Sequence, residues 1–315
     1  MYDNTTSSYS PRHWEEAELN QELDRLVELA WEPGWAPLGL GGLIRLCASL
    51  RQNTRDWMRI RHLLRSHPTM RRLMREDPLV FHASQPGAVR LDLLLGHPAA
   101  APLLADTSRA GRDLFAVTRA LPWCNAHRDR HAMMARMVDA VAAEIPGASI
   151  LTLGAGHLRE AADVTRLGRL SRWVVLEEDA ERRQALRQGL PPGVPLQVLR
   201  CSLRAFTRHP ARKGRFDLIY LPKAPLFWSA PETAALIAAA FGVLKPGGRL
   251  LLCSPGTPVP ESAWIDTYME RTPRWAMQRD MEEMLKAVDP TACASRQIFP
   301  SVDGHVMYAI LRRQG

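Results

Sequence analysis

Two glycines and a carboxylate mark where this chain could bind a nucleoside. An apolar run, residues 150–153, ends at Gly154-Ala155-Gly156 before a predicted helical stretch, and a second apolar run ends at Glu177. Glycines let backbone approach a ligand closely, and a carboxylate ending the next strand accepts hydrogen bonds from ribose hydroxyls. Glu177 stands about 20 residues beyond the glycines, as one β–α–β step predicts. A structural turn stays the alternative, because a glycine pair alone is weak evidence.

These residues need a parallel sheet to hold them, and two later segments predict one. Residues 215–221 form a buried strand, and an Ala-rich helical stretch then leads through Leu-Lys-Pro-Gly-Gly into an apolar strand within residues 243–253. The order of these segments resembles class I S-adenosylmethionine (SAM) methyltransferases. A nicotinamide dehydrogenase would carry a third glycine to place pyrophosphate on a helix N-terminus, whereas His-Leu-Arg-Glu follows Gly156. We therefore expect SAM as the cofactor.

This resemblance implies a set of cofactor-binding residues at the ends of the first three strands: Gly154, Ala155, Gly156, Glu177, Asp179, Ser202 and Leu203. The glycine loop would cover the methionine part of SAM, and Glu177 would bind the ribose. Asp179 would either support Glu177 or stabilise the start of a helix. Ser202 and Leu203 follow the third predicted strand, where members of the superfamily often contact adenine.

A narrower resemblance runs from about Asp77 to the end of the chain. Gly154–Ala161, with the sequence Gly-Ala-Gly-His-Leu-Arg-Glu-Ala, and the later Tyr268-Met-Glu270 segment resemble a bacterial family of SAM-dependent methyltransferases. That family makes an extracellular factor, 3-hydroxypalmitic acid methyl ester. The resemblance implies a carboxylate as methyl acceptor, while residues 221–228 depart from the family pattern.

The two resemblances supply the catalytic and substrate-binding candidates. His157 directly follows the glycine turn and would act as a base or orient the substrate. Tyr220 ends the fourth strand and would line the methyl-transfer region. Tyr268 and Trp275 would cap the substrate pocket, and Arg279 would clamp the carboxylate. A packed or surface role is the alternative for each residue. A carboxylate is already ionised at neutral pH, so the reaction mainly needs alignment and exclusion of water.

Other titratable residues receive structural interpretations. His127 and His131 share one helix face, but no third ligand is identifiable, so we expect no metal site. Arg159 and Glu160 would form a charged pair, either reaching the amino-acid end of SAM or lying on a helix surface. Five cysteines without a CxxC pair indicate neither a disulfide framework nor a thiolate zinc site.

Composition narrows the class of protein. The chain has 315 residues, of which 46% are hydrophobic, enough for a sizeable core. No run approaches the about 18 apolar residues of a membrane span, and residues 1–12 lack the apolar core of a signal peptide. We expect a soluble cytoplasmic protein. The net charge is +8, with arginines concentrated in one segment: Arg51, Arg55, Arg59, Arg61, Arg65, Arg71, Arg72 and Arg75. We favour a solvated helix face over a surface for an acidic carrier protein, a membrane or RNA.

The chain is expected to form two domains after a flexible segment, residues 1–12. Residues 13–145 are predicted to be mainly helical, with a helix over residues 13–32 and a flexible break at residues 39–42, and would serve as a substrate lid or in dimerisation. Residues 146–315 alternate strands and helices, as expected of an α/β, Rossmann-type methyltransferase sheet. Apolar runs at residues 294–299 and 305–311 predict a final antiparallel hairpin.

The favoured hypothesis is O-methylation of a small or acyl-chain carboxylic acid, free or carrier-bound, in bacterial specialised or signalling metabolism. N-methylation or another SAM-dependent group transfer stays open, as does a homodimer. A non-catalytic SAM-fold scaffold is supported by Pro222, Lys223 and Pro225 in the substrate loop. An RNA methyltransferase is the third alternative. This chain lacks the Asn/Asp-Pro-Pro-Tyr/Phe motif of base methylation after the fourth strand, so we do not expect nucleic acid as a partner.

Overall fold

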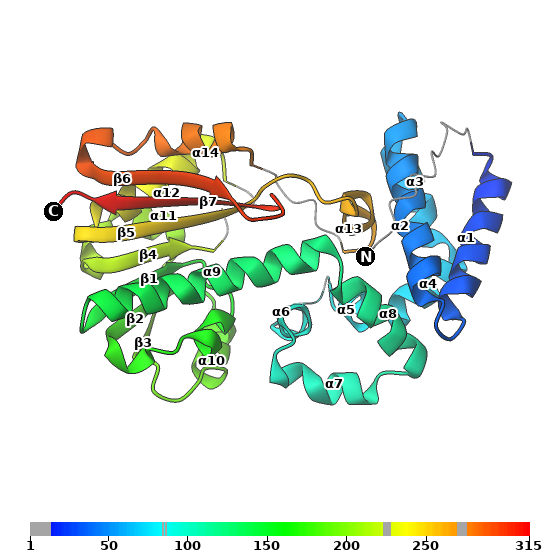
Figure 1. The fold of residues 1–315 in the computed structure, drawn as a ribbon, viewed down its shortest axis with the longest axis horizontal. Helices are drawn as coiled ribbons and strands as arrows, with labels where there is room; N and C mark the ends of the chain where they lie inside the picture. The colour runs from blue at the N-terminus through cyan, green and yellow to red at the C-terminus, as the bar shows by residue number, and fades with distance from the viewer. Residues whose placement is uncertain (1–13, 84, 86, 223–227, 270–275) are drawn as a thin grey trace. The chain divides into compact units, whose positions relative to one another are not determined.

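The computed structural model describes residues 14–83, 85, 87–222, 228–269 and 276–315. The chain forms two compact units (Figure 1). The helical unit comprises Met1–Asn125 and Val259–Thr272, and the sheet unit comprises Ala126–Pro258 and Pro273–Gly315. The predicted flexible segment, residues 1–12, lies outside the described residues.

The sheet unit has the strand arrangement of a Rossmann-type methyltransferase domain. Its strands are β1 (Ala148–Leu153), β2 (Leu170–Leu176), β3 (Leu196–Leu199), β4 (Phe216–Leu221), β5 (Leu244–Pro255), β6 (Cys293–Pro300) and β7 (Val306–Arg313). They form one seven-stranded sheet in the order β3-β2-β1-β4-β5-β7-β6. The first five strands pair in parallel, whereas β7 runs antiparallel to β5 and β6. The predicted fold class and the final hairpin are confirmed.

Helices cover both faces of this sheet because the central strands are apolar runs whose successive side chains point to opposite faces. Leu151 of β1 belongs to a core formed with α11 (Leu203–Arg208), α12 (Ala230–Gly242) and α14 (Gln278–Leu285). Ile150 belongs to the core of the opposite face, with α9 (Pro122–Glu144) and α10 (Ala180–Gln188). The result is a three-layer α/β/α unit.

The crossover from β1 to β2 differs from the sequence prediction. The stretch after Gly156 is not an α-helix but two 3₁₀ turns, η2 (Arg159–Asp163) and η3 (Leu167–Arg169). The Asp139 carboxylate of α9 accepts hydrogen bonds from the backbone N–H groups of Thr165 and Arg166, at 2.8–3.1 Å. These bonds fix the backbone after η2 in a turn, so the helix does not continue.

The helical unit is built from helices of differing length, several of which share one apolar core. They are α1 (Glu16–Trp31), α2 (Ala36–Asn53), α3 (Trp57–Ser66), α4 (Pro68–Glu76), α5 (Pro78–Phe81), α6 (Val89–Leu95), α7 (Ala101–Asp106), α8 (Arg109–Arg119) and α13 (Ser262–Tyr268). The first predicted helix is confirmed by α1. The expected flexible break at residues 39–42 is wrong, because these residues lie inside α2. A Cβ on Gly39 would lie 2.3 Å from the backbone nitrogen of Ala30, so the glycine lets α2 pack closely on α1.

The boundary between the units also differs from the expected position at residue 145. That position is the C-terminal end of α9, whose residues from Ala126 onward belong to the sheet unit. The later segment Val259–Thr272 returns to the helical unit, where Trp264 of α13 is fully buried. The Asp266 carboxylate accepts hydrogen bonds from the Trp57 indole at 2.8 Å and from Arg51 at 3.0 Å. Long-range contacts of this kind leave no local pattern in the sequence.

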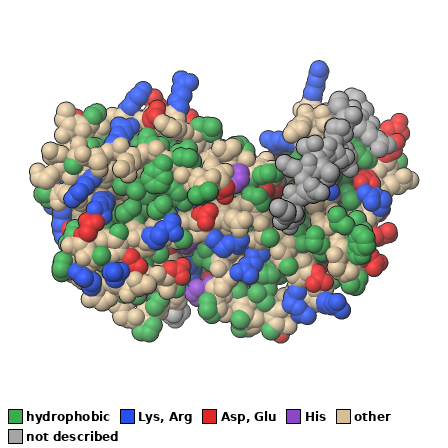
Figure 2. Space-filling model, viewed as in Figure 1, with side chains coloured by type: hydrophobic (Ala, Val, Ile, Leu, Met, Phe, Trp, Pro, Cys, Tyr) green, Lys and Arg blue, Asp and Glu red, His purple; other side chains and the backbone are tan. Residues whose placement is uncertain are grey.

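Several arginines of the basic segment contact neighbours within the helical unit. The Arg72 guanidinium lies 4.6 Å from the centroid of the Trp31 ring, and Arg59 lies 3.8 Å from the Glu16 carboxylate. On the face drawn in Figure 2, cationic side chains are interspersed with acidic and apolar ones. In the part of the chain that is described, no helix is long and apolar enough to cross a membrane.

Candidate cofactor and substrate site

The glycine loop leaves the carboxyl end of β1 at the point where the strand order reverses. Here β1 lies between β2 and β4, and ligands of open α/β sheets bind in the crevice at such a point. Gly154 and Gly156 have φ values of +74° and +58°, which L side chains rarely adopt. A Cβ on Gly154 would lie 4.0 Å from Leu203 Cδ1. The fold thus brings the loop close to one predicted adenine contact.

The residues that follow the loop continue its unusual backbone. Ala155 is half-buried and packs against the core on the α9 side, and His157 is half-buried directly after the turn. Leu158 also has a positive φ, +50°, and its side chain is fully buried. A leucine in this conformation costs about 1–2 kcal/mol, which its burial offsets. The buried side chain of Leu158 therefore anchors the loop, while Gly154 and Gly156 stay exposed.

Glu177 directly follows β2, and its side chain is 13% exposed. Its Oε1 accepts a hydrogen bond from the backbone N–H of Asp179 at 2.9 Å, which holds the carboxylate beside its own backbone. Asp179 caps α10, because its Oδ1 accepts from the Arg182 backbone N–H at 2.8 Å. This matches the helix-stabilising alternative for Asp179. A role in ribose binding stays a prediction for both carboxylates.

Ser202 and the cavity beside it occupy the carboxyl end of β3. Ser202 caps α11, since its Oγ accepts from the Ala205 backbone N–H at 3.1 Å. A cavity of about 330 Å³ opens next to it, lined by Glu178, Arg200, Cys201, Ser202, Ala205, His209, Arg212 and Lys213. Only Ser202 of this set is predicted from the sequence, because the other lining residues are spread from Glu178 to Lys213. The cavity gives the predicted adenine region a cationic border.

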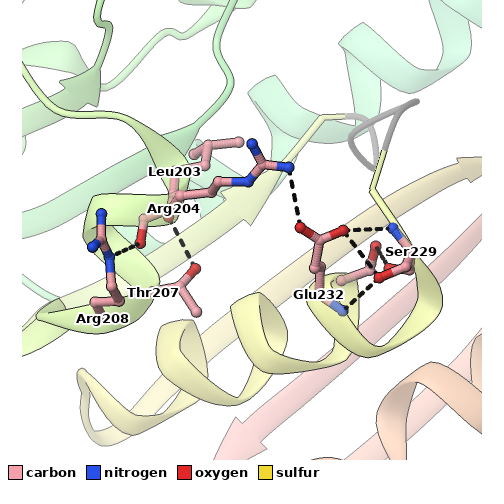
Figure 3. A network of polar contacts seen from close by, with 7 residues as sticks. Leu203, Arg204, Thr207, Arg208, Ser229 and Glu232 are labelled. Atoms are coloured by element: carbon pink, nitrogen blue, oxygen red, sulfur yellow. Dashed lines mark hydrogen bonds and ion pairs between the residues drawn. The ribbon is translucent and has the colours of Figure 1, made fainter.

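A polar network fixes the first turns of α11 and α12 relative to each other (Figure 3). Arg204 donates to the Glu232 carboxylate at 3.1 Å, and Glu232 forms a capping box with Ser229 at the start of α12. The Arg204 guanidinium also lies 5.6 Å from the centroid of the Trp228 ring. The network therefore joins the start of α11, where Leu203 lies, to Trp228 and the start of α12. Residues 223–227 of the divergent loop lie outside the described residues.

A buried polar cluster lies beneath the glycine loop, and the sequence analysis did not foresee it. Tyr220 is fully buried in β4 and donates to Glu160 Oε1 at 2.6 Å. Glu160 is 1% exposed, so it is part of neither a surface pair nor an exposed site. His131 Nδ1 on α9 lies 3.5 Å from Glu160 Oε2, although the two atoms do not form a hydrogen bond. Arg159, the expected partner of Glu160, instead donates to the Gly189 carbonyl at 2.9 Å.

Burial controls the protonation of this cluster. It raises the pKa of Glu160 to about 7, although the hydrogen bond from Tyr220 acts in the opposite direction. Burial, and to a smaller extent the charge of Arg130, lower the pKa of His131 to about 3, so this histidine is neutral at physiological pH. Burial and then Glu160 raise the pKa of Tyr220 well above its ordinary value. At neutral pH, Arg130 is thus the one permanent charge of the cluster formed by Arg130, His131, Glu160 and Tyr220.

The remaining candidates belong to other elements of the chain. Tyr268 ends α13 in the helical unit, where its hydroxyl donates to the Leu64 carbonyl at 3.2 Å. Arg279 is exposed in the first turn of α14. Trp275 lies outside the described residues. His127 Nδ1 is 2.8 Å from Arg130 Nη2, which gives this histidine a structural partner.

No family model and no curated protein matches this chain. Among solved structures, a possible exported protein of Bordetella parapertussis is similar over 98% of this chain and 100% of its own, with 13% identity and a TM-score of 0.57. The N-methyltransferase NodS of Bradyrhizobium japonicum matches 61% of this chain and 98% of its own, with 15% identity and a TM-score of 0.42. A 1,6-didemethyltoxoflavin-N1-methyltransferase of Burkholderia thailandensis matches 70% and 90%, with 18% identity and a TM-score of 0.42. The first likeness shows a shared fold along the whole chain.

The residues at the switch point fit SAM. The positive φ values of Gly154 and Gly156 expose the backbone of the loop to a ligand. Glu177 carries a half-buried carboxylate just after the end of β2, and its Oε1 lies 3.8 Å from Arg182 Nε. The connection after the loop offers only 3₁₀ turns, so it lacks the helix N-terminus that a pyrophosphate would need.

Proposed function

We propose that this protein is a SAM-dependent methyltransferase. One observation carries the proposal. At the switch point of a methyltransferase-type sheet, β1 ends in a loop with two glycines of positive φ, and the adjacent parallel strand β2 ends at the carboxylate of Glu177. When bound, SAM supplies an electrophilic methyl group on a sulfonium. Gly154 and Gly156 would bind the methionine part through the backbone, and Glu177 would accept from the ribose hydroxyls.

The acceptor that we propose is the carboxylate of a small or acyl-chain metabolite. The support is the resemblance to methyltransferases that make hydroxypalmitate methyl ester, carried by the segment Gly154–Ala161. A carboxylate acceptor needs orientation and a dry site more than a base. The site fits this need, because Tyr220 and Glu160 are buried and bonded to each other and thus do not present a free base.

Calorimetric titration with SAM and with S-adenosylhomocysteine tests the cofactor assignment. Glu177→Ala removes the ribose acceptor, and hydrogen bonds to a charged group contribute about 1.5–3 kcal/mol, so we expect a loss of affinity of about 10- to 150-fold. Glu181→Ala is the matched control, because Glu181 is an exposed carboxylate in the first turn of α10. Folded wild-type protein that binds neither compound would contradict the proposal and favour a scaffold without cofactor.

The RNA alternative has a separate test. Binding through the arginines of α3 and α4 would be electrostatic, so its affinity would fall steeply with salt concentration. Contacts such as Arg72 with Trp31 and Arg51 with Asp266 already engage part of this basic segment. Measurement of RNA binding at two salt concentrations distinguishes the two hypotheses. If the protein methylates a small acid, we expect no specific RNA binding at either salt concentration.

A further inference from the structure

Two consecutive residues of α9 present buried nitrogens that lack hydrogen-bond partners. Among the described residues, Arg130 Nε and His131 Nδ1 are buried without an acceptor or a donor. A buried polar group left in this way costs about 1–3 kcal/mol, and more when it is charged. Such groups are rare in folded proteins and indicate a water, an ion or a ligand that completes them. The pair therefore points to a binding position on the inner side of α9.

The neighbours of Arg130 place this position at the carboxyl end of the sheet. Its guanidinium acts electrostatically on Cys253, Tyr308 and Glu160. Cys253 lies two residues before the end of β5 and pairs with Tyr308 of β7. Glu160 follows the glycine loop and is bonded to Tyr220 near the end of β4. Arg130 thus lies over the ends of β4 and β5, on the same edge of the sheet as the proposed SAM loop.

The electrostatics of this position favour an anion. Arg130 Nη2 contacts the Nδ1 atom of His127 at 2.8 Å, and the guanidinium forms no ion pair with a described carboxylate within 4.0 Å. Glu160, the acid on which it acts, is already occupied by Tyr220 and is close to half-protonated at neutral pH. A partly buried guanidinium with a free Nε edge can bind a carboxylate through two parallel hydrogen bonds. The charge at this position is therefore positive and only partly compensated by Glu160.

We propose that Arg130 binds the carboxylate of the methyl acceptor, with His131 beside it. This inference rests on the proposed function and replaces Arg279, whose side chain is exposed on α14, as the carboxylate clamp. One carboxylate oxygen attacks the methyl carbon, the C–O bond forms, and the C–S electron pair passes to sulfur. The ester that results is neutral, so its hold on Arg130 weakens and product release is favoured.

The test compares binding of octanoate and octanamide to the full chain, without cofactor, by calorimetry. We expect wild-type protein to bind octanoate at least tenfold more tightly than octanamide. Arg130→Gln should abolish this preference, and Arg130→Lys should reduce it, because lysine keeps the charge but lacks the planar fork. Arg136→Gln is the matched control, since Arg136 is exposed on the same helix and should leave the preference unchanged.

The outcomes separate this inference from the proposed function. A folded Arg130→Gln variant that keeps the preference for octanoate would overturn the inference, as would wild-type protein that shows no preference. Removal of a charge that forms no ion pair with a described carboxylate should not unfold the protein, and circular dichroism of both Arg130 variants checks this point. Parallel titration with S-adenosylhomocysteine reports on the cofactor alone. An Arg130-dependent preference without S-adenosylhomocysteine binding would support the anion site and contradict the methyltransferase.

Discussion

The buried carboxylate beneath the glycine loop makes a prediction about stability and pH. Glu160 has an ordinary pKa of 4.5, which burial raises to about 7 in the folded protein. Its contribution to folding is therefore fully present below pH 4.5 and is lost as the pH rises through about 7. The difference between these two pKa values corresponds to about 3 kcal/mol, at 1.36 kcal/mol for each pH unit.

Glu160→Gln removes this dependence while it keeps an acceptor for the Tyr220 hydroxyl. Between pH 4 and pH 8, the unfolding free energy of the wild type should therefore fall by about 3 kcal/mol relative to that of the variant. His131 acts in the opposite direction, because its lowered pKa makes stability fall as the pH drops below 6.5, but it is present in both proteins and cancels. The comparison between the two proteins therefore isolates the carboxylate.

Urea unfolding across this pH range gives the free energies, and hydrogen exchange in peptides from β1 and β4 assigns them to the sheet unit. Glu181→Gln, in an exposed position on α10, should follow the wild-type curve at every pH. If the Glu160→Gln curve also stays parallel to wild type, Glu160 does not change its proton affinity on folding. The description of Glu160 as a buried carboxylate with a raised pKa would then be wrong.

Two further predictions concern the helical unit. Gly39→Ala should destabilise this unit by about 1–3 kcal/mol, because the new Cβ would lie 2.3 Å from Ala30 N. Gly41→Ala, whose new Cβ would have its nearest neighbour at 3.4 Å, should instead stabilise α2 by about 0.5–1 kcal/mol. Thermal unfolding distinguishes the two variants, and equal effects would contradict close packing of α1 on α2. Asp266→Ala should cost about 1.5–3 kcal/mol in urea unfolding, since the Trp57 indole loses its acceptor, and an unchanged midpoint would show that this contact does not hold α13.

Local patterns in the sequence were sufficient for the architecture of the sheet unit. Apolar runs bounded by turns located β1, β4 and β5, and the glycines of residues 154–156 marked the loop at the switch point. The final hairpin followed from two apolar runs joined by an Asp-Gly turn. These features depend on residues that are near one another in the chain, and neighbouring residues determine periodicity and turn geometry.

Features that depend on distant residues escaped the sequence analysis. Nothing near Glu160 in the chain shows that Tyr220, 60 residues later, reaches its carboxylate. The missing helix after the glycine loop depends on Asp139, which stands before β1 and binds the backbone of the crossover. Gly39 resembled a hinge because the sequence does not show that Ala30 packs against it. In each case tertiary contacts overrode the local preference.

The return of Val259–Thr272 to the helical unit has a consequence for the order in which the chain folds. Trp264 and Ala263 complete a core whose other members are residues 19–114. During synthesis, which proceeds from the N-terminus, helices α1 to α8 leave the ribosome long before α13 does. The strands from β1 to β5 emerge in between. The helical unit must therefore wait with an open core while most of the sheet is made, and a fragment that ends at Asn125 should expose the apolar surface that Trp264 otherwise covers.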